Sequence, residues 1–167
     1  MQYTIRILTP DDAVAFRRVR LDALRLHPEA FLSAYEDEVQ LSLEQFTERL
    51  TTPGVTRFGG FAGEELVGLV GLNCRTGAKE RHKAHLFSMY VDAAHRSSGL
   101  SSQLVTSVID AARAAHASVL QLSVTVGNAP AQRLYRRKGF VPYGIEQRAL
   151  RIAGRFYDEE LMALDLD

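Results

Sequence analysis

The segment from Val91 to Ser101 places the strongest constraint on the fold of this chain. An apolar stretch, 82–91, has the pattern of a strand, and a helical pattern, 99–116, follows it after a short polar turn. At such a junction, several backbone N–H groups without helical partners converge with the positive end of the helix dipole. Gly99 would let an anion approach the backbone closely, and Arg96 would add a positive charge. The segment therefore indicates an anion-binding turn, for which an ordinary strand-to-helix turn is the alternative.

The rest of the chain alternates between strand and helix patterns without a linker, a repeat or a low-complexity segment, which predicts one domain over 1–167. Capping residues and apolar spacing predict further helices that start after Thr9, Ser42 and Asn128 and end near His27, Leu50 and Gly139. Strands are predicted at 3–8, 56–61, 66–73, 82–91, 119–126, 141–147 and 156–166. This order predicts a mixed α/β sheet. Two helices have predicted buried stripes, which are Phe16, Val19, Ala23 and Leu26 in the first and Leu100, Leu104, Val108, Ala111 and Ala115 in the helix over 99–116.

Composition limits the classes of partner. The chain of 167 residues carries 20 basic and 20 acidic residues, and this balance argues against a dedicated nucleic-acid binder. Its single cysteine, Cys74, cannot form an internal disulfide, and no apolar run approaches the roughly 18 residues of a membrane span. No apolar signal segment begins the sequence, and no spacing of His, Cys and Asp suggests a metal site. We therefore expect a cytoplasmic protein without a metal or a membrane span.

A second segment, Asn128–Phe140, follows the strand at 119–126. Taken together, the two segments allow a more specific interpretation than the first one alone. Together the two segments resemble the signatures of the GNAT superfamily of acyl-CoA-dependent N-acetyltransferases. Arg96–Ser101 resembles its pyrophosphate loop, Arg/Gln-x-x-Gly-x-Gly/Ala, with Ser101 at a position where Gly or Ala is usual. Serine is small, so we expect weakened rather than abolished cofactor binding. The other signature, Asn-x-x-Ala-x-x-Leu-Tyr-x-x-x-Gly-Phe, is matched at Asn128, Ala131, Leu134, Tyr135, Gly139 and Phe140.

The resemblance implies a fold and a cofactor site. The fold would be a mixed, mostly antiparallel sheet of about six to seven strands, with about four flanking helices and a splayed parallel pair at 82–91 and 119–126. Acetyl-CoA would lie in that splay, with its pantetheine arm paired like a strand to the backbone of Met89 and Val91. The resemblance places the cofactor-binding residues at Met89, Val91, Arg96, Ser97, Ser98, Gly99, Leu100, Ser101, Asn128, Ala131 and Tyr135.

The resemblance also implies three catalytic roles. The backbone N–H of Met89 would stabilise the developing oxyanion, and the phenol of Tyr135 would donate to the departing thiolate. The base is less defined, because an amine with a pKa of about 10.4 must lose a proton at pH 7. His85 lies six residues before Val91, where some family members have a catalytic glutamate, and histidine titrates near neutral pH. A water relay is the alternative to His85, and plain core packing is the alternative for Tyr135.

The acceptor side is expected to be acidic and aromatic. In relatives, the loop between the first two helices and the last two strands form its walls, and the candidates there are Glu29, Phe31, Tyr35, Tyr157 and Glu159. Such a wall would suit a cationic amine. We expect Asp37 and Glu38 to be solvated instead, and also most of the basic run at Arg133, Arg136, Arg137 and Lys138.

The sequence thus predicts direct acetyl transfer from acetyl-CoA to a primary amine of a small molecule or peptide. The alternative is a non-catalytic acyl-CoA-binding regulatory module on the same fold, and a purely structural α/β domain is a weaker one. A homodimer is possible, as among relatives. The acceptor itself is not identified by the sequence, because acceptor loops vary most within one fold.

Overall fold

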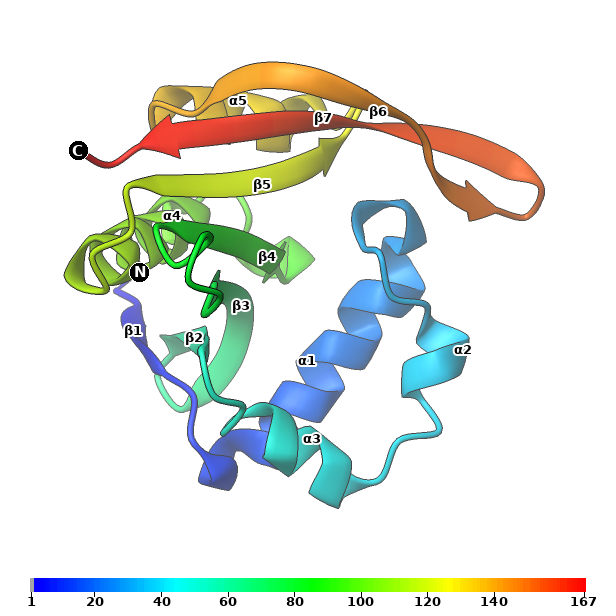
Figure 1. Cartoon of the computed structure of the whole chain (residues 1–167). Helices are drawn as coiled ribbons and strands as arrows, with labels where there is room; N and C mark the ends of the chain where they lie inside the picture. Colours follow the sequence, from blue (N-terminus) through cyan, green and yellow to red (C-terminus); the bar gives the residue numbers. More distant parts are fainter. Residues whose placement is uncertain (1) are drawn as a thin grey trace.

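The computed structural model describes residues 2–167. Its strands and helices follow the predicted order, with one additional short helix, α2 (Figure 1). The elements are β1 (Thr4–Ile7), α1 (Ala13–Leu26), α2 (Tyr35–Glu38), α3 (Leu43–Arg49), β2 (Val55–Ala62), β3 (Glu65–Cys74), β4 (Lys83–Val91), α4 (Leu100–Ala114), β5 (Val119–Thr125), α5 (Ala129–Arg137), β6 (Val141–Ile152) and β7 (Arg155–Asp165). Short 3-10 helices precede α1 (Pro10–Asp12), follow it (Pro28–Ala30) and follow β4 (Ala93–His95). No helix within residues 2–167 is long and apolar enough to cross a membrane.

The seven strands described in residues 2–167 form one mixed sheet in the order β1-β2-β3-β4-β5-β7-β6. All neighbouring pairs are antiparallel except β4 and β5, which are parallel because α4 crosses over between them. This arrangement confirms the predicted mixed, mostly antiparallel sheet. The strand β6 extends to Ile152, which is five residues beyond its predicted end at Gln147.

The parallel pair β4–β5 is joined along only a short part of its length. Lys83, Ala84 and His85 pair with Val119, Leu120 and Gln121, and no pairing of the two strands is found beyond His85 in the described chain. On its other side β5 stays paired with β7 from Val119 to Thr125. The two strands therefore separate after His85 and leave a gap in the middle of the sheet (Figure 1).

A β-bulge bends β4 where the gap opens. Between the pairs Gly71–Phe87 and Leu69–Tyr90, β4 advances by three residues and β3 by two. Ser88, inside this stretch, has a φ of 56°, which is a left-handed conformation for a residue with a Cβ. The extra residue increases the local twist of the strand and turns it away from β5.

The helix α4 covers one face of the sheet. A Cβ at Gly60 in β2 would lie 2.6 Å from the Leu100 side chain, so this glycine lets α4 approach closely. The predicted stripe is confirmed at Leu100, Leu104 and Val108 but is wrong at its end. The helix ends at Ala114, not at His116, so Ala115 is exposed beyond it and Ala111 is only partly buried. The residues that complete the buried face are Val105, Ile109 and Ala112.

The helix α1 covers the opposite face. Its predicted stripe is buried at Phe16, Val19 and Ala23, but Leu26 is 52% exposed. The buried face is centred between Phe16 and Ala23, and Leu26 lies at its edge on the last residue of the helix. Arg20 lies in the middle of this face, where the helical periodicity would place an apolar residue, and it is 6% exposed.

Arg20 forms a buried ion pair with Glu38 of α2. Its Nε and Nη2 donate to the two carboxylate oxygens of Glu38 at 3.0 and 2.9 Å, and Arg49 of α3 contacts the same carboxylate at 3.1 Å. Glu38 is 3% exposed, so the prediction that it is solvated was wrong, whereas Asp37 is exposed as expected. The cause is its place on the inner side of an unpredicted helix, between two arginines. The pair holds α1, α2 and α3 together.

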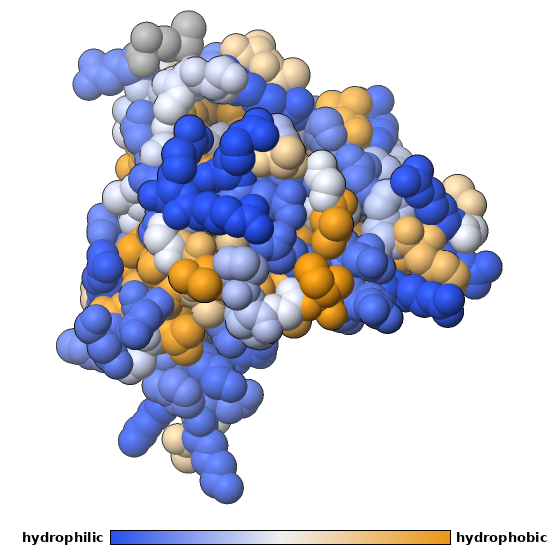
Figure 2. All heavy atoms as spheres, turned by 90° about the horizontal axis from the view of Figure 1, so that it is seen from above, coloured by the Kyte–Doolittle hydropathy of each residue, from blue (hydrophilic) through white to orange (hydrophobic). Residues whose placement is uncertain are grey.

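The outer edge of the sheet carries exposed apolar side chains on β6. Val141, Tyr143 and Ile145 are 64%, 56% and 52% exposed. Seen from above, hydrophobic atoms gather in patches separated by hydrophilic ones (Figure 2). The homodimer that the family resemblance makes possible stays a prediction.

Substitution of Glu38 by Gln is expected to lower the free energy of unfolding by about 3 kcal/mol at pH 7, because it leaves two guanidinium groups without their carboxylate. Burial alone would raise the pKa of Glu38, but its contacts with Arg20 and Arg49 outweigh burial and hold that pKa below its ordinary value. Its stabilisation is therefore present above the unfolded pKa of about 4.3 and is lost as the pH falls through the lower folded value.

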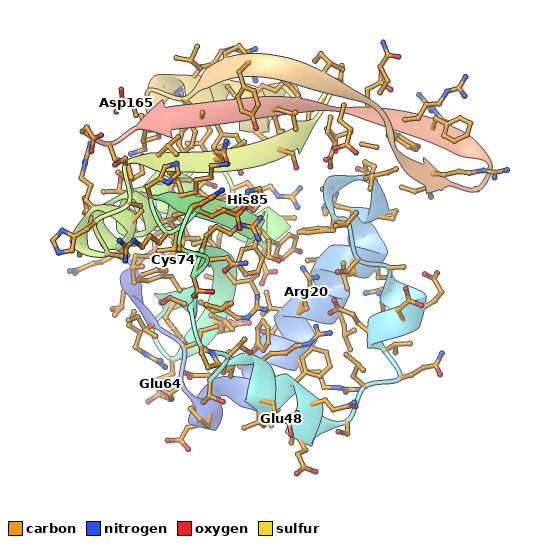
Figure 3. The ribbon with its side chains drawn as sticks, viewed as in Figure 1. Arg20, Glu48, Glu64, Cys74, His85 and Asp165 are labelled. Atoms are coloured by element: carbon orange, nitrogen blue, oxygen red, sulfur yellow. The ribbon has the colours of Figure 1, made fainter. Side chains whose placement is uncertain are left out.

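Urea denaturation of wild type and Glu38→Gln at pH 7 and pH 3 measures this difference. The exposed Glu48 of α3 (Figure 3) provides the matched control, because Glu48→Gln should change stability by less than about 0.5 kcal/mol. The difference in the free energy of unfolding between wild type and Glu38→Gln should be smaller at pH 3 than at pH 7. An equal difference at both pH values, or no difference at pH 7, would contradict the role of the ion pair.

Candidate active site

The gap between β4 and β5 opens into a cavity of about 1140 Å³. It is lined by β4 from Leu86 to Val91, by β5 from Ser123 to Thr125, by the turn before α4 and by α5. Its other end lies against the segment after α1 and against β7. The cavity therefore crosses the sheet, so that two molecules could enter from opposite sides and meet beside β4.

One wall of the cavity is a strand edge without a partner. Because the ladder to β5 stops at His85, the β5-facing backbone groups from Leu86 to Val91 have no neighbouring strand in the described chain. Met89 and Val91, the two predicted backbone contacts, both line the cavity. An extended ligand could complete this edge by strand-like hydrogen bonds.

The turn before α4 continues this edge with free N–H groups. Within residues 2–167, the backbone N–H groups of Ser97, Gly99 and Ser101 donate to no other residue, and all three residues line the cavity. Gly99 is the N-cap of α4 with a φ of 89°, and a Cβ there would meet nothing within 4 Å. Glycine is thus required by the backbone conformation and leaves open space in front of the helix N-terminus. The geometry is that of an anion site.

Two residues of the predicted loop do not line the cavity. The side chain of Leu100 is fully buried in the core, and the hydroxyl of Ser98 donates to the carbonyl oxygen of His95 at 2.5 Å. Ser98 also accepts weakly from the Leu100 N–H at 3.4 Å. Their contribution is to shape the turn.

Arg96 lines the cavity, but its guanidinium group already has protein partners. Its Nε donates to the carbonyl oxygen of Val91 at 3.1 Å, and its Nη2 lies 2.7 Å from Nε2 of His27. The group stands over the ring of Tyr90, 6.0 Å from its centre. Arg96 therefore ties the end of β4 to the C-cap of α1. Positive charge at the α5 side of the cavity comes instead from Arg133 and Arg137, both of which line it.

The helix α5 brings the second predicted motif to the cavity. The side chain of Asn128 accepts from the N–H of Ala131 at 3.4 Å, which confirms Asn128 as the N-cap, and both residues line the cavity. The rest of the basic run is engaged elsewhere, since Arg136 contacts Glu160 at 2.5 Å and Lys138 donates to Thr106 at 2.7 Å.

Tyr135 of α5 lies at the meeting point of the core and the cavity. It is 5% exposed, packs edge-on against Phe140 and also lines the cavity. Burial raises the pKa of its phenol above the ordinary value. Its hydroxyl has no hydrogen-bond partner within residues 2–167, so it is free to donate to a ligand in the gap.

His85, the predicted base, is labelled on β4 in Figure 3 and is not among the residues that line the cavity, which on β4 begin at Leu86. It is the last residue of β4 that pairs with β5, opposite Gln121, so it sits where the strands are still closed. Burial, and then the charge of Arg75, lower the pKa of its imidazole, which keeps it neutral at pH 7. The bulge at Ser88 also breaks the strand alternation that would have put His85 on one face with Met89 and Val91. Its role as the base stays a prediction.

The acceptor wall is less acidic than expected. Glu29, Phe31 and Tyr157 line the cavity, and Glu29 is the only carboxylate among its lining residues in the described chain. Tyr35 and Glu159 are not among its lining residues, and Tyr35 packs instead against the core cluster that includes Phe16 and Val19 of α1. The backbone of Glu29 is fixed by the Thr125 hydroxyl, which donates to its carbonyl oxygen at 2.5 Å.

Sequence reasoning missed four residues that shape this end of the cavity. Ser88 and Thr125 line it from β4 and β5, Arg155 lines it from β7 with its guanidinium 5.1 Å from the ring of Tyr157, and Arg20 lies beneath Phe31 at 5.4 Å from its ring. Only Arg20 left a signal in the sequence, as a charged residue on the apolar face of a helix.

Comparisons with known proteins agree with this geometry. The profile of the acetyltransferase (GNAT) family matches residues 18–140. The structure is similar to an acetyltransferase of the GNAT family from Streptococcus pneumoniae, with 26% identity, a TM-score of 0.83 and coverage of 98% of this chain and 99% of that one. It is also similar to a ribosomal-protein-alanine N-acetyltransferase from Brucella melitensis, with 25% identity, a TM-score of 0.82 and coverage of 98% and 99%.

A third similar structure, from Salmonella typhimurium, contains its cofactor acetyl-CoA and matches with 24% identity, a TM-score of 0.82 and coverage of 100% of this chain and 95% of that one. A comparison with curated protein sequences finds no significant match. The family match covers well over half of the chain. The chain therefore belongs to the acetyltransferase (GNAT) family, as its two motifs indicated.

Proposed function

We propose that this protein transfers the acetyl group of acetyl-CoA directly to a primary amine of a small molecule or peptide. The observation that carries the proposal is the gap between β4 and β5, whose free strand edge leads into free N–H groups at one end and faces Tyr135 across the cavity. Acetyl-CoA has an extended pantetheine arm that would match the strand edge, a diphosphate that would match the free N–H groups, and an acetyl thioester that would lie beside Tyr135.

The residues present fit the cofactor. The edge of Leu86–Val91 would pair with the amide groups of the pantetheine arm, and the N–H groups of Ser97, Gly99 and Ser101 would hold the diphosphate. Ser101 leaves its N–H group available, so the serine is compatible with this role. Arg133 and Arg137 add positive charge at the same end.

The amine must be neutral to attack. A lysine-like amine with a pKa of about 10.4 is neutral at pH 7 in only about one molecule in 2,500, a cost of about 4.6 kcal/mol. Glu29 is placed to attract the ammonium form, and Phe31 and Tyr157 would contact its carbon chain. The proton lost from the amine would go to water in the cavity or, through water, to the neutral imidazole of His85.

Two groups of the chain would assist the transfer. As the amine nitrogen bonds to the acetyl carbon, the N–H of Met89 would donate to the carbonyl oxygen that gains negative charge. As the carbon–sulfur bond breaks, Tyr135 would donate to the departing sulfur. Because burial raises the pKa of this phenol, while a thiol has a pKa near 8.5, its main contribution is a hydrogen bond from a phenol that stays protonated.

Acetyl-CoA at millimolar concentration should raise the melting temperature, because it binds only the folded state. Release of free CoA thiol should rise when an amine is added, which is tested with a panel of free amino acids, spermidine, kanamycin and short peptides. A shift in melting temperature without turnover on the whole panel would favour the non-catalytic acyl-CoA-binding module. Absence of any shift would contradict both functions.

Tyr135→Phe should lower kcat by about 10- to 100-fold and leave the acetyl-CoA-induced shift in melting temperature almost unchanged, because the ring stays and only the donor is lost. The matched control is Tyr143→Phe, which removes the hydroxyl of an exposed tyrosine on β6 and should act like wild type. Unchanged kcat in Tyr135→Phe would remove this residue from the mechanism.

A further inference from the structure

The conformation of Ser88 is unusual and lies next to a residue with a proposed catalytic role. Its φ of 56° belongs to the left-handed region, which an L-residue with a Cβ enters only at a cost. Ser88 lines the cavity and immediately precedes Met89, whose N–H faces the reacting carbonyl in the proposed function. The direction of the Met89 N–H therefore depends on the backbone of Ser88.

Arg20 donates a hydrogen bond to the side chain of Ser88. Its Nη1 donates to the Ser88 hydroxyl at 3.0 Å, while its Nε and Nη2 are fixed by Glu38. The side chains of Arg20 and Glu38 are only 7% and 4% exposed, so water competes little for these hydrogen bonds. A guanidinium group held at two nitrogens by a buried carboxylate presents its third nitrogen in a fixed direction.

The contact also connects the two halves of the site. Arg20 lies on α1, between the sheet and α2, and its guanidinium is 5.4 Å from the ring of Phe31 on the acceptor wall (Figure 3). The same group therefore touches the acceptor wall and the bulge beside the cofactor edge. The two hydrogen bonds from Arg20 to Glu38 already connect α1 to α2. The additional hydrogen bond to Ser88 is not needed for that connection.

We infer that Arg20 is a positioning residue that, through the Ser88 hydroxyl, holds the bulge of β4 in its left-handed conformation and so directs the N–H of Met89 into the cavity. The inference rests on the proposed acetyl transfer. Arg20 itself does not line the cavity, so its proposed effect on the N–H of Met89 passes through Ser88.

Two substitutions at Ser88 separate this role from others. Ser88→Ala removes the hydroxyl but keeps the Cβ, so the left-handed conformation loses its anchor, and kcat should fall by about 5- to 30-fold. Ser88→Gly removes the same hydroxyl, but glycine enters the left-handed region without that cost, so its kcat should be at least about threefold higher than that of Ser88→Ala. The KM for acetyl-CoA should change little in both. Ser107→Ala on α4 is the control for loss of a serine hydroxyl.

The rates are measured with acetyl-CoA and the amine of the panel that gives the fastest thiol release. A fall of equal size in the Ala and Gly variants would overturn the inference, because the hydroxyl itself would then be required. Wild-type kcat in Ser88→Ala would overturn it as well, while the proposed acetyl transfer would stand.

A second pair of variants tests Arg20 directly. Arg20→Met should lower kcat like Ser88→Ala, and Arg20→Met combined with Ser88→Gly should recover most of it, since glycine no longer needs the anchor. Failure of this rescue in a double variant that still unfolds cooperatively would contradict the inference. If wild type releases no thiol with any amine, a crystal structure of Ser88→Ala decides: a negative φ at residue 88 supports the inference, and a φ near that of wild type overturns it.

Discussion

The short pairing between β4 and β5 is the constraint on which the rest of this structure depends. Only Lys83–His85 joins the two parallel strands, and beyond that point the bulge at Ser88 turns β4 away while β7 keeps β5 in place. A sheet closed at this position would have a continuous core and no cavity. The opening leaves backbone groups of β4 without a partner, and a buried strand edge is stable only if something else satisfies it. The cofactor of the proposed reaction has the extended amide chain that this edge can pair with.

Charge is distributed unevenly around this opening although the whole chain has a formal net charge of zero. The diphosphate end has free N–H groups at the start of α4 together with Arg133 and Arg137, whereas the acceptor end has the single carboxylate of Glu29. Two other acidic groups of these segments are engaged within the protein: Glu38 pairs with Arg20, and Glu160 with Arg136. In the proposed function, few charged groups would select the acceptor, and Glu29 among them lies on a segment that Thr125 fixes to β5.

The sequence predicted the order of the elements, the mixed sheet and the start of the two helices beside the cavity, because these depend on local signals such as apolar periodicity, Gly99 and the cap at Asn128. It did not predict features that depend on contacts distant in the chain. Glu38 reads as a solvated acid within an acidic run, and only the fold brings Arg20 and Arg49 against it. The resemblance suggested His85 as the base, but this residue pairs with Gln121 where the strands are still closed and is not among the residues that line the cavity. Tyr35 likewise lies outside the cavity because it packs against a core cluster built from residues distant in the chain.

Amide hydrogen exchange with and without acetyl-CoA tests most directly whether the gap in the sheet is the cofactor site. We expect acetyl-CoA to slow exchange at two stretches of backbone, the free edge of Leu86–Val91 and the turn from Ser97 to Ser102, and to leave the outer edge of β6 unchanged. Both stretches should respond together, because one extended molecule would occupy them. Protection confined to other elements, or no protection at saturating acetyl-CoA, would contradict the account.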